Sequence, residues 1–427
     1  MKRFPVFIAT VMMVSAMQAA DKLDLKAITS GEFAASYVTG INPIDGTDLY
    51  ASISNDGKQV ISYSFKTGKQ VSILFDVSAV KAPFEQIEGY VISPDGKKLL
   101  IMTHREAIYR RSFKAEYFVY DIAKKSLKKL SQGVNQQVAT WSPDSRHIAF
   151  VKDNNLFVTD GDKETQITRD GKFNEVINGI PDWVYEEEFS FNRALEFSAD
   201  SQMLAFIRFD EKDVPSYSFP LFAGQAPHFT PFEKYPGEYT YKYPKTGEVN
   251  SKVSVHTFDI KSKVTRKINV PVDADGYIPR IRFTQDPNKL AVMTLNRHQN
   301  RFDLYFADPR STVAKLALRD ESDTYIRENV FDNIVFYPEN FSFVSEKSGY
   351  NHLYWYSIGG NLLKQVTAGP YEVQEFLGYD PEEGSFYFSS NEESPMRSAI
   401  YKIDRKGKKT RLSSQAGTNS AQFSANM

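Results

Sequence analysis

A short turn motif recurs along most of the 427-residue chain and restricts its fold more than any other feature. In each clear copy, Ser or Thr is followed two positions later by Asp, and an apolar segment begins four residues after that Asp. Ser and Asp side chains bond the local backbone in tight turns, and the Pro in two copies fixes the turn dihedral. Each copy therefore predicts a turn that leads into a β-strand. The clear copies begin at Ser54, Ser93, Ser142, Ser198 and Thr284, and weaker copies begin at Tyr337, Gly378 and Ser424.

Further predicted strands follow each strand that the turn motif introduces. Several of these second strands end in Asp, and third strands follow at 165–168 and 364–367. Sets of three or four strands that repeat roughly every 40 to 55 residues are typical of propeller blades, which bury their faces against their neighbours. The aromatic content of 14% also favours strands. We predict an all-β fold, a β-propeller. A pair of β-sandwiches would give similar spacing, but the turn motif favours the propeller.

Two places depart from this regular spacing. The interval between Asp200 and Asp286 is far longer than the others, and its stretch 219–243 is rich in Tyr and Pro. We expect an extended arm there, because long insertions in compact domains usually lie outside the core. The last copy begins at Ser424, almost at the end of the chain, so a further blade is expected to start and to be cut off.

The composition excludes several kinds of chemistry. The chain has no cysteine, which removes disulfides, thiolate catalysis and cysteine-ligated metals. Its six histidines stand singly, so we expect no metal and no other cofactor. The net charge of -1 gives no electrostatic reason to expect nucleic acid as a partner. The Gly-x-Ser-x-Gly pattern of a hydrolase nucleophile is also missing, so we expect no catalytic residue in this chain.

The first twenty residues have the layout of a secretory signal peptide. Lys2 and Arg3 precede an apolar run over 4–17, and small residues follow it. The run is short for a membrane-spanning helix. We predict a signal peptide over 1–20 and an exported protein that is periplasmic, associated with the cell envelope or secreted. The alternative is a short amino-terminal helix.

The segment 182–189 stands apart because it places three glutamates among aromatic residues. Asp182 can cap a short helix, and acidic residues in the first turn suit the helix dipole. Successive helical residues are turned by about 100°, so at most two of the three glutamates can converge on one ligand. Trp183 and Tyr185 could form the wall of a pocket in which paired carboxylates hold a cation. The alternative is a solvated acidic face of a helix.

This octapeptide resembles the acidic motif of the dipeptidyl peptidase IV family, serine exopeptidases in which a propeller is joined to an α/β-hydrolase domain. The segments 109–113, 178–180, 243–250 and 344–350 also resemble family sequences, so the likeness covers 21–427, closest to cysteine-free bacterial members. It implies an eight-bladed parent propeller whose last blade is cut off here. It also implies that the hydrolase domain, with its Ser, Asp and His, lies outside this chain.

The resemblance assigns roles to particular residues. Glu187 and Glu188 would receive the free ammonium of a peptide's amino terminus, and Arg110 would contact the carbonyl of the second residue, with Arg111 as a competitor for that role. An ammonium has three donors, which two carboxylates and one carbonyl can satisfy. The family removes dipeptides that end in Pro or Ala.

Three further expectations follow from the resemblance. The partners implied are the peptide's amino terminus and the hydrolase domain, together with a second copy of the chain bound through the insertion 219–250. A propeller that binds peptides or proteins without any catalysis remains an alternative. A relative that releases tripeptides is a second alternative, although the paired glutamates favour dipeptides.

Overall fold

The computed structural model describes residues 24–32, 34, 40–133, 135–222 and 235–424, which fall into two units, 1–40 and 41–427. The predicted signal peptide lies outside the described residues. In the first unit, α1 (Leu25–Thr29) is a short exposed helix capped by Asp24, whose Oδ1 accepts a hydrogen bond of 2.7 Å from the Ala27 N–H. No helix within the described ranges has the length and apolar character needed to cross a membrane.

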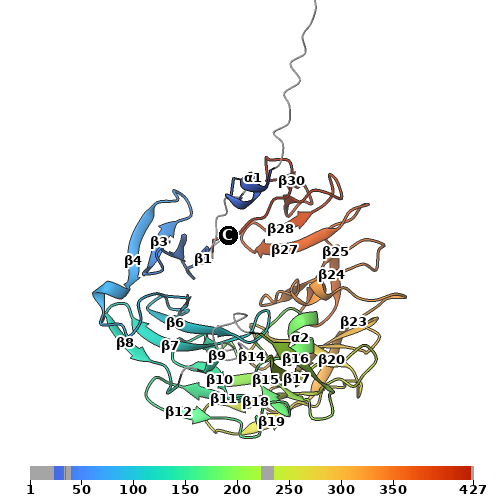
Figure 1. Cartoon of the computed structure of the whole chain (residues 1–427). Helices are drawn as coiled ribbons and strands as arrows, with labels where there is room; N and C mark the ends of the chain where they lie inside the picture. Colours follow the sequence, from blue (N-terminus) through green and yellow to red (C-terminus); the bar gives the residue numbers. More distant parts are fainter. Residues whose placement is uncertain (1–23, 33, 35–39, 134, 223–234, 425–427) are drawn as a thin grey trace, which may run out of the picture. The chain divides into compact units, whose positions relative to one another are not determined.

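The second unit is all-β, as predicted, and consecutive groups of antiparallel strands follow one another around a common centre (Figure 1). The strands of the first three groups are β1 (Asn42–Pro43), β2 (Leu49–Ile53), β3 (Gln59–Ser64), β4 (Gln70–Asp76), β5 (Gly89–Ile92), β6 (Lys98–Ala107), β7 (Phe113–Asp121), β8 (Ser126–Lys129), β9 (Gln136–Trp141), β10 (Ile148–Lys152), β11 (Asn155–Thr159) and β12 (Glu164–Gln166). β1–β4 form one sheet. β5–β8 and β9–β12 join into one sheet because Ala115 pairs with Gln136.

The next group carries the insertion and the acidic helix. Its elements are β13 (Val176–Asn178), α2 (Trp183–Glu188), β14 (Leu195–Phe197), β15 (Met203–Asp210), β16 (Ser216–Leu221), β17 (Gly237–Lys242), β18 (Lys252–Asp259) and β19 (Thr265–Lys267). β15 is the central strand and pairs with β13, β14 and β18. β16 and β17 pair only with each other, as a separate two-stranded ribbon that corresponds to the arm expected from the sequence.

The remaining strands form three further groups among the described residues. They are β20 (Tyr277–Phe283), β21 (Leu290–Leu295), β22 (Arg301–Ala307) and β23 (Ala314–Glu321); β24 (Asn340–Ser345), β25 (His352–Ser357) and β26 (Leu362–Gln365); and β27 (Val373–Asp380), β28 (Ser385–Ser390), β29 (Ala399–Ile403) and β30 (Lys409–Arg411). Two short 3-10 helices, η1 (Val77–Ala79) and η3 (Glu328–Phe331), lie in connecting segments. Small antiparallel sheets repeated in chain order are the architecture of a β-propeller.

The turn motif acts through its serine. In the copy at Ser142, the hydroxyl donates to Asp144 Oδ1 at 2.6 Å and accepts the His147 N–H at 2.9 Å. The copies at 54, 93 and 198 repeat both bonds. The copy at Thr284 differs, since its hydroxyl accepts the Asp286 N–H instead. The weak copy at Gly378 lies inside β27, and the turn follows it.

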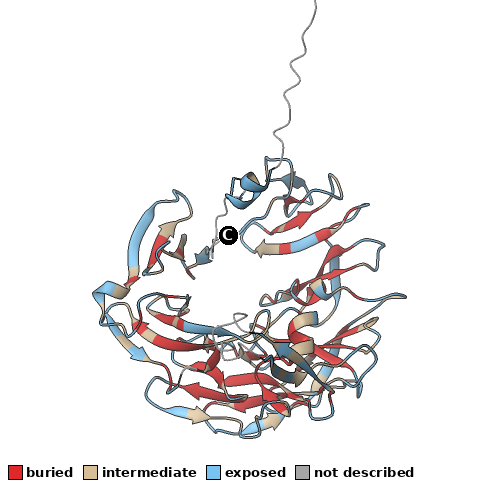
Figure 2. Ribbon diagram, viewed as in Figure 1, coloured by how far each residue is buried: buried red, intermediate tan, exposed pale blue. Residues whose placement is uncertain are grey.

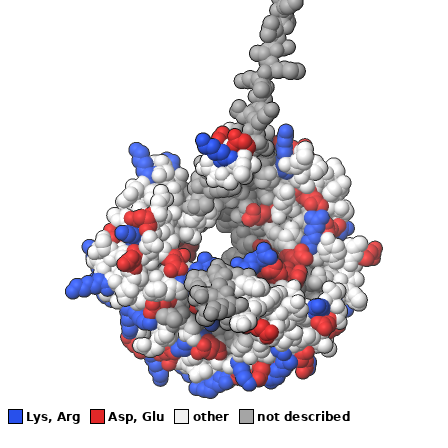
Figure 3. Space-filling view, viewed as in Figure 1, with Lys and Arg blue, Asp and Glu red and all other residues white. Residues whose placement is uncertain are grey.

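The groups of strands are held together mainly by apolar packing. Figure 2 shows that buried residues follow the middle strands of the groups, whereas outer strands such as β26 and β30 are exposed. Turns also link neighbouring groups, because Ser145 Oγ accepts the Asp95 N–H and Ser201 Oγ accepts the Asp144 N–H, each at 3.0 Å. Acidic and basic side chains are interspersed over the face shown in Figure 3.

Candidate functional site

The helix α2 begins at Trp183, as the capping pattern predicted. Asp182 Oδ1 accepts the Tyr185 N–H at 2.9 Å, and its other oxygen accepts a hydrogen bond from the Ser251 hydroxyl. Burial raises the pKa of Asp182. This cap fixes where the helix starts and therefore which way each of the following glutamates points.

The three glutamates of α2 lie in three different environments. Glu186 is 1% exposed, Glu187 is half-buried, and Glu188 is exposed. This divergence follows from the turn of about 100° between successive helical residues. The structure places Glu187 beside a cavity, whereas Glu188 does not line it.

Glu187 forms a two-pronged ion pair with Arg110. The Arg110 Nε lies 2.9 Å from Glu187 Oε1 and 3.1 Å from Oε2, and Nη2 lies 2.7 Å from Oε1. Hydrogen bonding from Arg110 lowers the pKa of Glu187 and raises the pKa of Arg110, so both groups stay charged at neutral pH. Glu187 and Arg110, which were predicted to contact the two ends of a bound dipeptide, are therefore adjacent before any ligand binds.

Glu186 holds the hairpin tip that carries Arg110. Its Oε1 accepts the Arg111 N–H at 2.6 Å and the Ser112 N–H at 2.8 Å. The Arg111 side chain donates to the Glu186 carbonyl and to the Ser190 hydroxyl. Arg111 is thus bound to the end of α2, and Arg110 is the arginine that pairs with Glu187.

Sequence reasoning missed the role of Glu186, although a signal for it was present. The four buried residues Asp182, Tyr185, Glu186 and Phe189 follow the spacing of the inward stripe of an amphipathic helix. Tyr185 was expected in a pocket wall, but it is buried in the core and does not line the cavity described below. Its ring packs 4.9 Å from that of Phe209.

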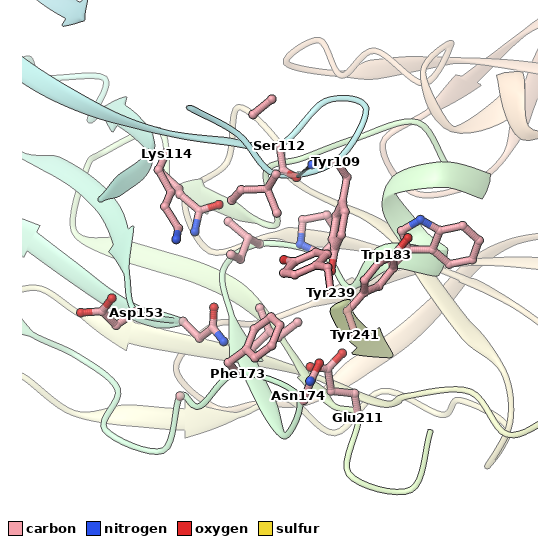
Figure 4. Close-up of a pocket in the computed structure, with 18 of the residues that line it drawn as sticks. Tyr109, Ser112, Lys114, Asp153, Phe173, Asn174, Trp183, Glu211, Tyr239 and Tyr241 are labelled. Atoms are coloured by element: carbon pink, nitrogen blue, oxygen red, sulfur yellow. Dashed lines mark hydrogen bonds between the residues drawn. The ribbon is translucent and has the colours of Figure 1, made fainter. Parts of the chain in front are cut away.

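Arg110 and Glu187 line a cavity of about 1040 Å³. Figure 4 shows other residues of its lining. Trp183 lines it, in the position expected for a pocket wall. Neighbouring rings come from the hairpin between β6 and β7 and from the ribbon β16–β17, with centroids 5.0 Å apart for Tyr109 and Tyr241. The aromatic lining residues are Tyr109, Phe173, Trp183, Phe219, Tyr239, Tyr241 and Tyr243.

Glu106, Asp153 and Glu211 also line this cavity, and Glu211 is the carboxylate with the most strongly raised pKa among the described cavity residues. Glu211 follows β15, is 4% exposed and lies beside Asn174 in Figure 4. Burial raises the pKa of Glu211 to about 8. The sequence offered no local signal for this residue, because it approaches the cavity only through the packing of β15 against neighbouring strands.

These groups are suited to binding a cation. Carboxylates supply charge, and aromatic faces attract ammonium groups. Across the described ranges, no three His, Asp or Glu side chains are grouped as metal ligands. Arg110, Lys114 and Lys172 line the same cavity, so its lining carries charges of both signs.

Comparison with known proteins identifies relatives over most of the chain. The sequence model for the dipeptidyl peptidase IV (DPP IV) N-terminal region matches residues 93–427. "Probable dipeptidyl peptidase 4" of Aspergillus fumigatus is 30% identical over 378 residues, which cover 84% of this chain and 48% of that protein. Dipeptidyl peptidase 4 of Trichophyton rubrum is 31% identical over 371 residues, which cover 83% and 46% respectively.

Solved structures agree with these matches. The crystal structure of Porphyromonas gingivalis dipeptidyl peptidase 4 is similar with a TM-score of 0.90 and 42% sequence identity, over 95% of this chain and 57% of that chain. The chain spans about half the length of the curated relatives it matches. On this evidence the chain belongs to the dipeptidyl peptidase IV family, in which it matches the N-terminal propeller region.

Proposed function

We propose that this propeller binds the free amino terminus of peptides for an exported, dipeptidyl peptidase IV-like serine exopeptidase. The peptides would carry Pro or Ala in second position, and the Ser, Asp and His that cleave them would belong to a hydrolase domain. Export is inferred from the signal-peptide layout of residues 1–20. The family membership and the geometry around α2 support the proposal.

The observation that carries this proposal is the Arg110–Glu187 pair at the edge of the cavity. Glu187 presents an ionised carboxylate that an ammonium can share, because a carboxylate has about four acceptor sites and Arg110 occupies only part of them. Arg110 keeps donors that are free to turn towards a carbonyl, since its side chain is 67% exposed. Glu188 is exposed on the next helical position, where an arriving ligand can still reach it.

The proposal is tested by peptide binding to the purified chain, measured by calorimetry. A peptide that begins Ala-Pro should bind, and the same peptide with an acetylated amino terminus should bind at least tenfold more weakly. The double variant Glu187→Gln with Glu188→Gln should lose this preference. Asp213→Asn is the control, since Asp213 is an exposed carboxylate paired with Lys252. Equal binding of free and acetylated peptides by the unmodified chain would refute the proposal.

A further inference from the structure

We propose that the cavity holds a second cation site, in which Glu211 and the rings of Tyr109, Tyr239 and Tyr241 bind an alkylammonium group. Such a group can come from a lysine side chain at the first position of a bound peptide or from a free alkylamine. The peptide source rests on the proposed function, whereas the free amine does not.

Glu211 is held in place by its backbone. Its N–H donates to the Glu175 carbonyl at 2.9 Å, and its carbonyl accepts the Val214 N–H at 3.0 Å. The side chain is buried yet lines the cavity. None of the ion pairs within 4.0 Å in the described part of the chain includes Glu211. The carboxyl group is therefore a buried acid without an ion-pair partner, and its ionised form is costly there unless a cation binds beside it.

The rings of Tyr109, Tyr239 and Tyr241 line the same cavity as Glu211, and we call these four residues the cage. Tyr241 lies between the two other tyrosines, with centroids 5.0 Å from Tyr109 and 5.4 Å from Tyr239. Tyr109 is close enough to Glu211 that the carboxylate contributes to raising the pKa of the Tyr109 phenol. The attraction of a cation to an aromatic face is stronger when the cation is desolvated. Carboxylate and rings together favour an alkylammonium over a metal ion.

The cage is continuous with the Arg110–Glu187 pair. Glu187, Trp183 and Tyr241 line the same cavity, and the ring of Trp183 lies 6.5 Å from that of Tyr241. The aromatic wall thus runs from the exposed carboxylate to the buried one. A peptide whose amino terminus binds Glu187 can lay its first side chain along this wall towards Glu211.

The charges around Glu211 make the binding depend on pH. Its pKa of about 8 results from burial first and from Asp182 and Asp210 next, while Lys242 and the Asn174 N–H act in the opposite direction. Lys242 Nζ is bonded to the carbonyls of Lys212 and Val214, which keeps it engaged elsewhere. A bound alkylammonium favours ionised Glu211, so binding at pH 7 releases a proton.

The test compares two peptides on the full chain by calorimetry, one beginning Lys-Pro and one beginning norleucine-Pro. Norleucine keeps the length of lysine and lacks the charge. The Lys peptide should bind about tenfold more tightly, and its binding should release a proton. Glu211→Gln should remove the difference and leave the norleucine affinity unchanged, which also shows that the variant folds. Asp213→Asn should keep the difference.

Free n-butylamine separates the two sources. If the site takes free amines, butylamine binds directly and loses that binding in Glu211→Gln. If it takes side chains only, butylamine has no effect and the Lys preference remains. Equal binding of both peptides together with no butylamine binding overturns the proposal. If free and acetylated peptides bind equally well while the Lys peptide is still preferred, the proposed function is overturned and the second cation site stands.

Discussion

Replacement of Glu186 by alanine tests whether this buried carboxylate positions the arginine of the site. The substitution removes the acceptor of two backbone hydrogen bonds, from Arg111 at 2.6 Å and from Ser112 at 2.8 Å. A hydrogen bond to a charged group contributes about 1.5 kcal/mol or more. The two bonds together therefore give about 3 kcal/mol, which is a factor of more than one hundred in the opening of the hairpin tip.

The assay is hydrogen exchange followed by mass spectrometry. The amides of Arg111 and Ser112 should exchange about one hundred times faster in Glu186→Ala, whereas the amides of β10 and β11 should keep their protection if the fold is intact. Glu188→Ala is the matched control, because Glu188 is exposed. Exchange at the hairpin tip within threefold of the unmodified chain would refute the reasoning.

A second measurement separates positioning from general stabilisation. Glu186→Gln keeps an acceptor oxygen in the same place, so it should restore most of the protection at the hairpin tip. It should also restore the binding of an Ala-Pro peptide that Glu186→Ala weakens, because Arg110 then regains its place beside Glu187. If Glu186→Gln restores the protection of the hairpin tip but not the binding of the peptide, the positioning role is contradicted.

Three further predictions concern charge and turns. Arg110→Lys should weaken binding of Ala-Pro peptides in calorimetry and raise the pKa of Glu187 in an NMR titration, because the two-pronged contact is lost. Folding raises the pKa of Glu211 from 4.5 to about 8, so the free energy of unfolding should fall as pH rises between these values. Glu211→Gln should remove this pH dependence, measured by urea unfolding at several pH values. Ser142→Ala should lower the free energy of unfolding in urea by about 1 kcal/mol, because the half-buried His147 N–H loses its acceptor.

The strand groups could be predicted because their signal is local. In the turn at Ser142, one hydroxyl bonds both Asp144 and the His147 N–H, so a few residues determine where the chain reverses and where the next strand begins. The same locality explains why α2 was predicted from Asp182. The joining of β5–β8 with β9–β12 was not predictable, because it depends on one pair, Ala115 with Gln136, that no turn specifies.

The site was predictable only in its helical part. Glu187 was identified through the acidic segment, and Glu186 could have been identified from its place on the buried stripe of α2. Glu211 and Tyr109 could not, because they approach one cavity from segments far apart in sequence. Their convergence is a product of how the strand groups pack, which neither the segment 109–113 nor the end of β15 specifies.

Two of the carboxylates that line the cavity, Glu187 and Glu211, suit successive steps of binding. Glu187 is partly exposed and paired with Arg110, so it remains ionised in water and can attract an ammonium at little cost in desolvation. Glu211 is buried and holds a proton at neutral pH until a cation arrives, so it adds no charge to an empty cavity. A ligand with one ammonium satisfies the first group alone, whereas a ligand with two satisfies both and displaces a proton. Selectivity for a second cationic group should therefore increase as pH rises towards 8. Recognition of the amino terminus should weaken over the same range, because the α-amino group loses its proton at about pH 8 while Glu187 stays ionised.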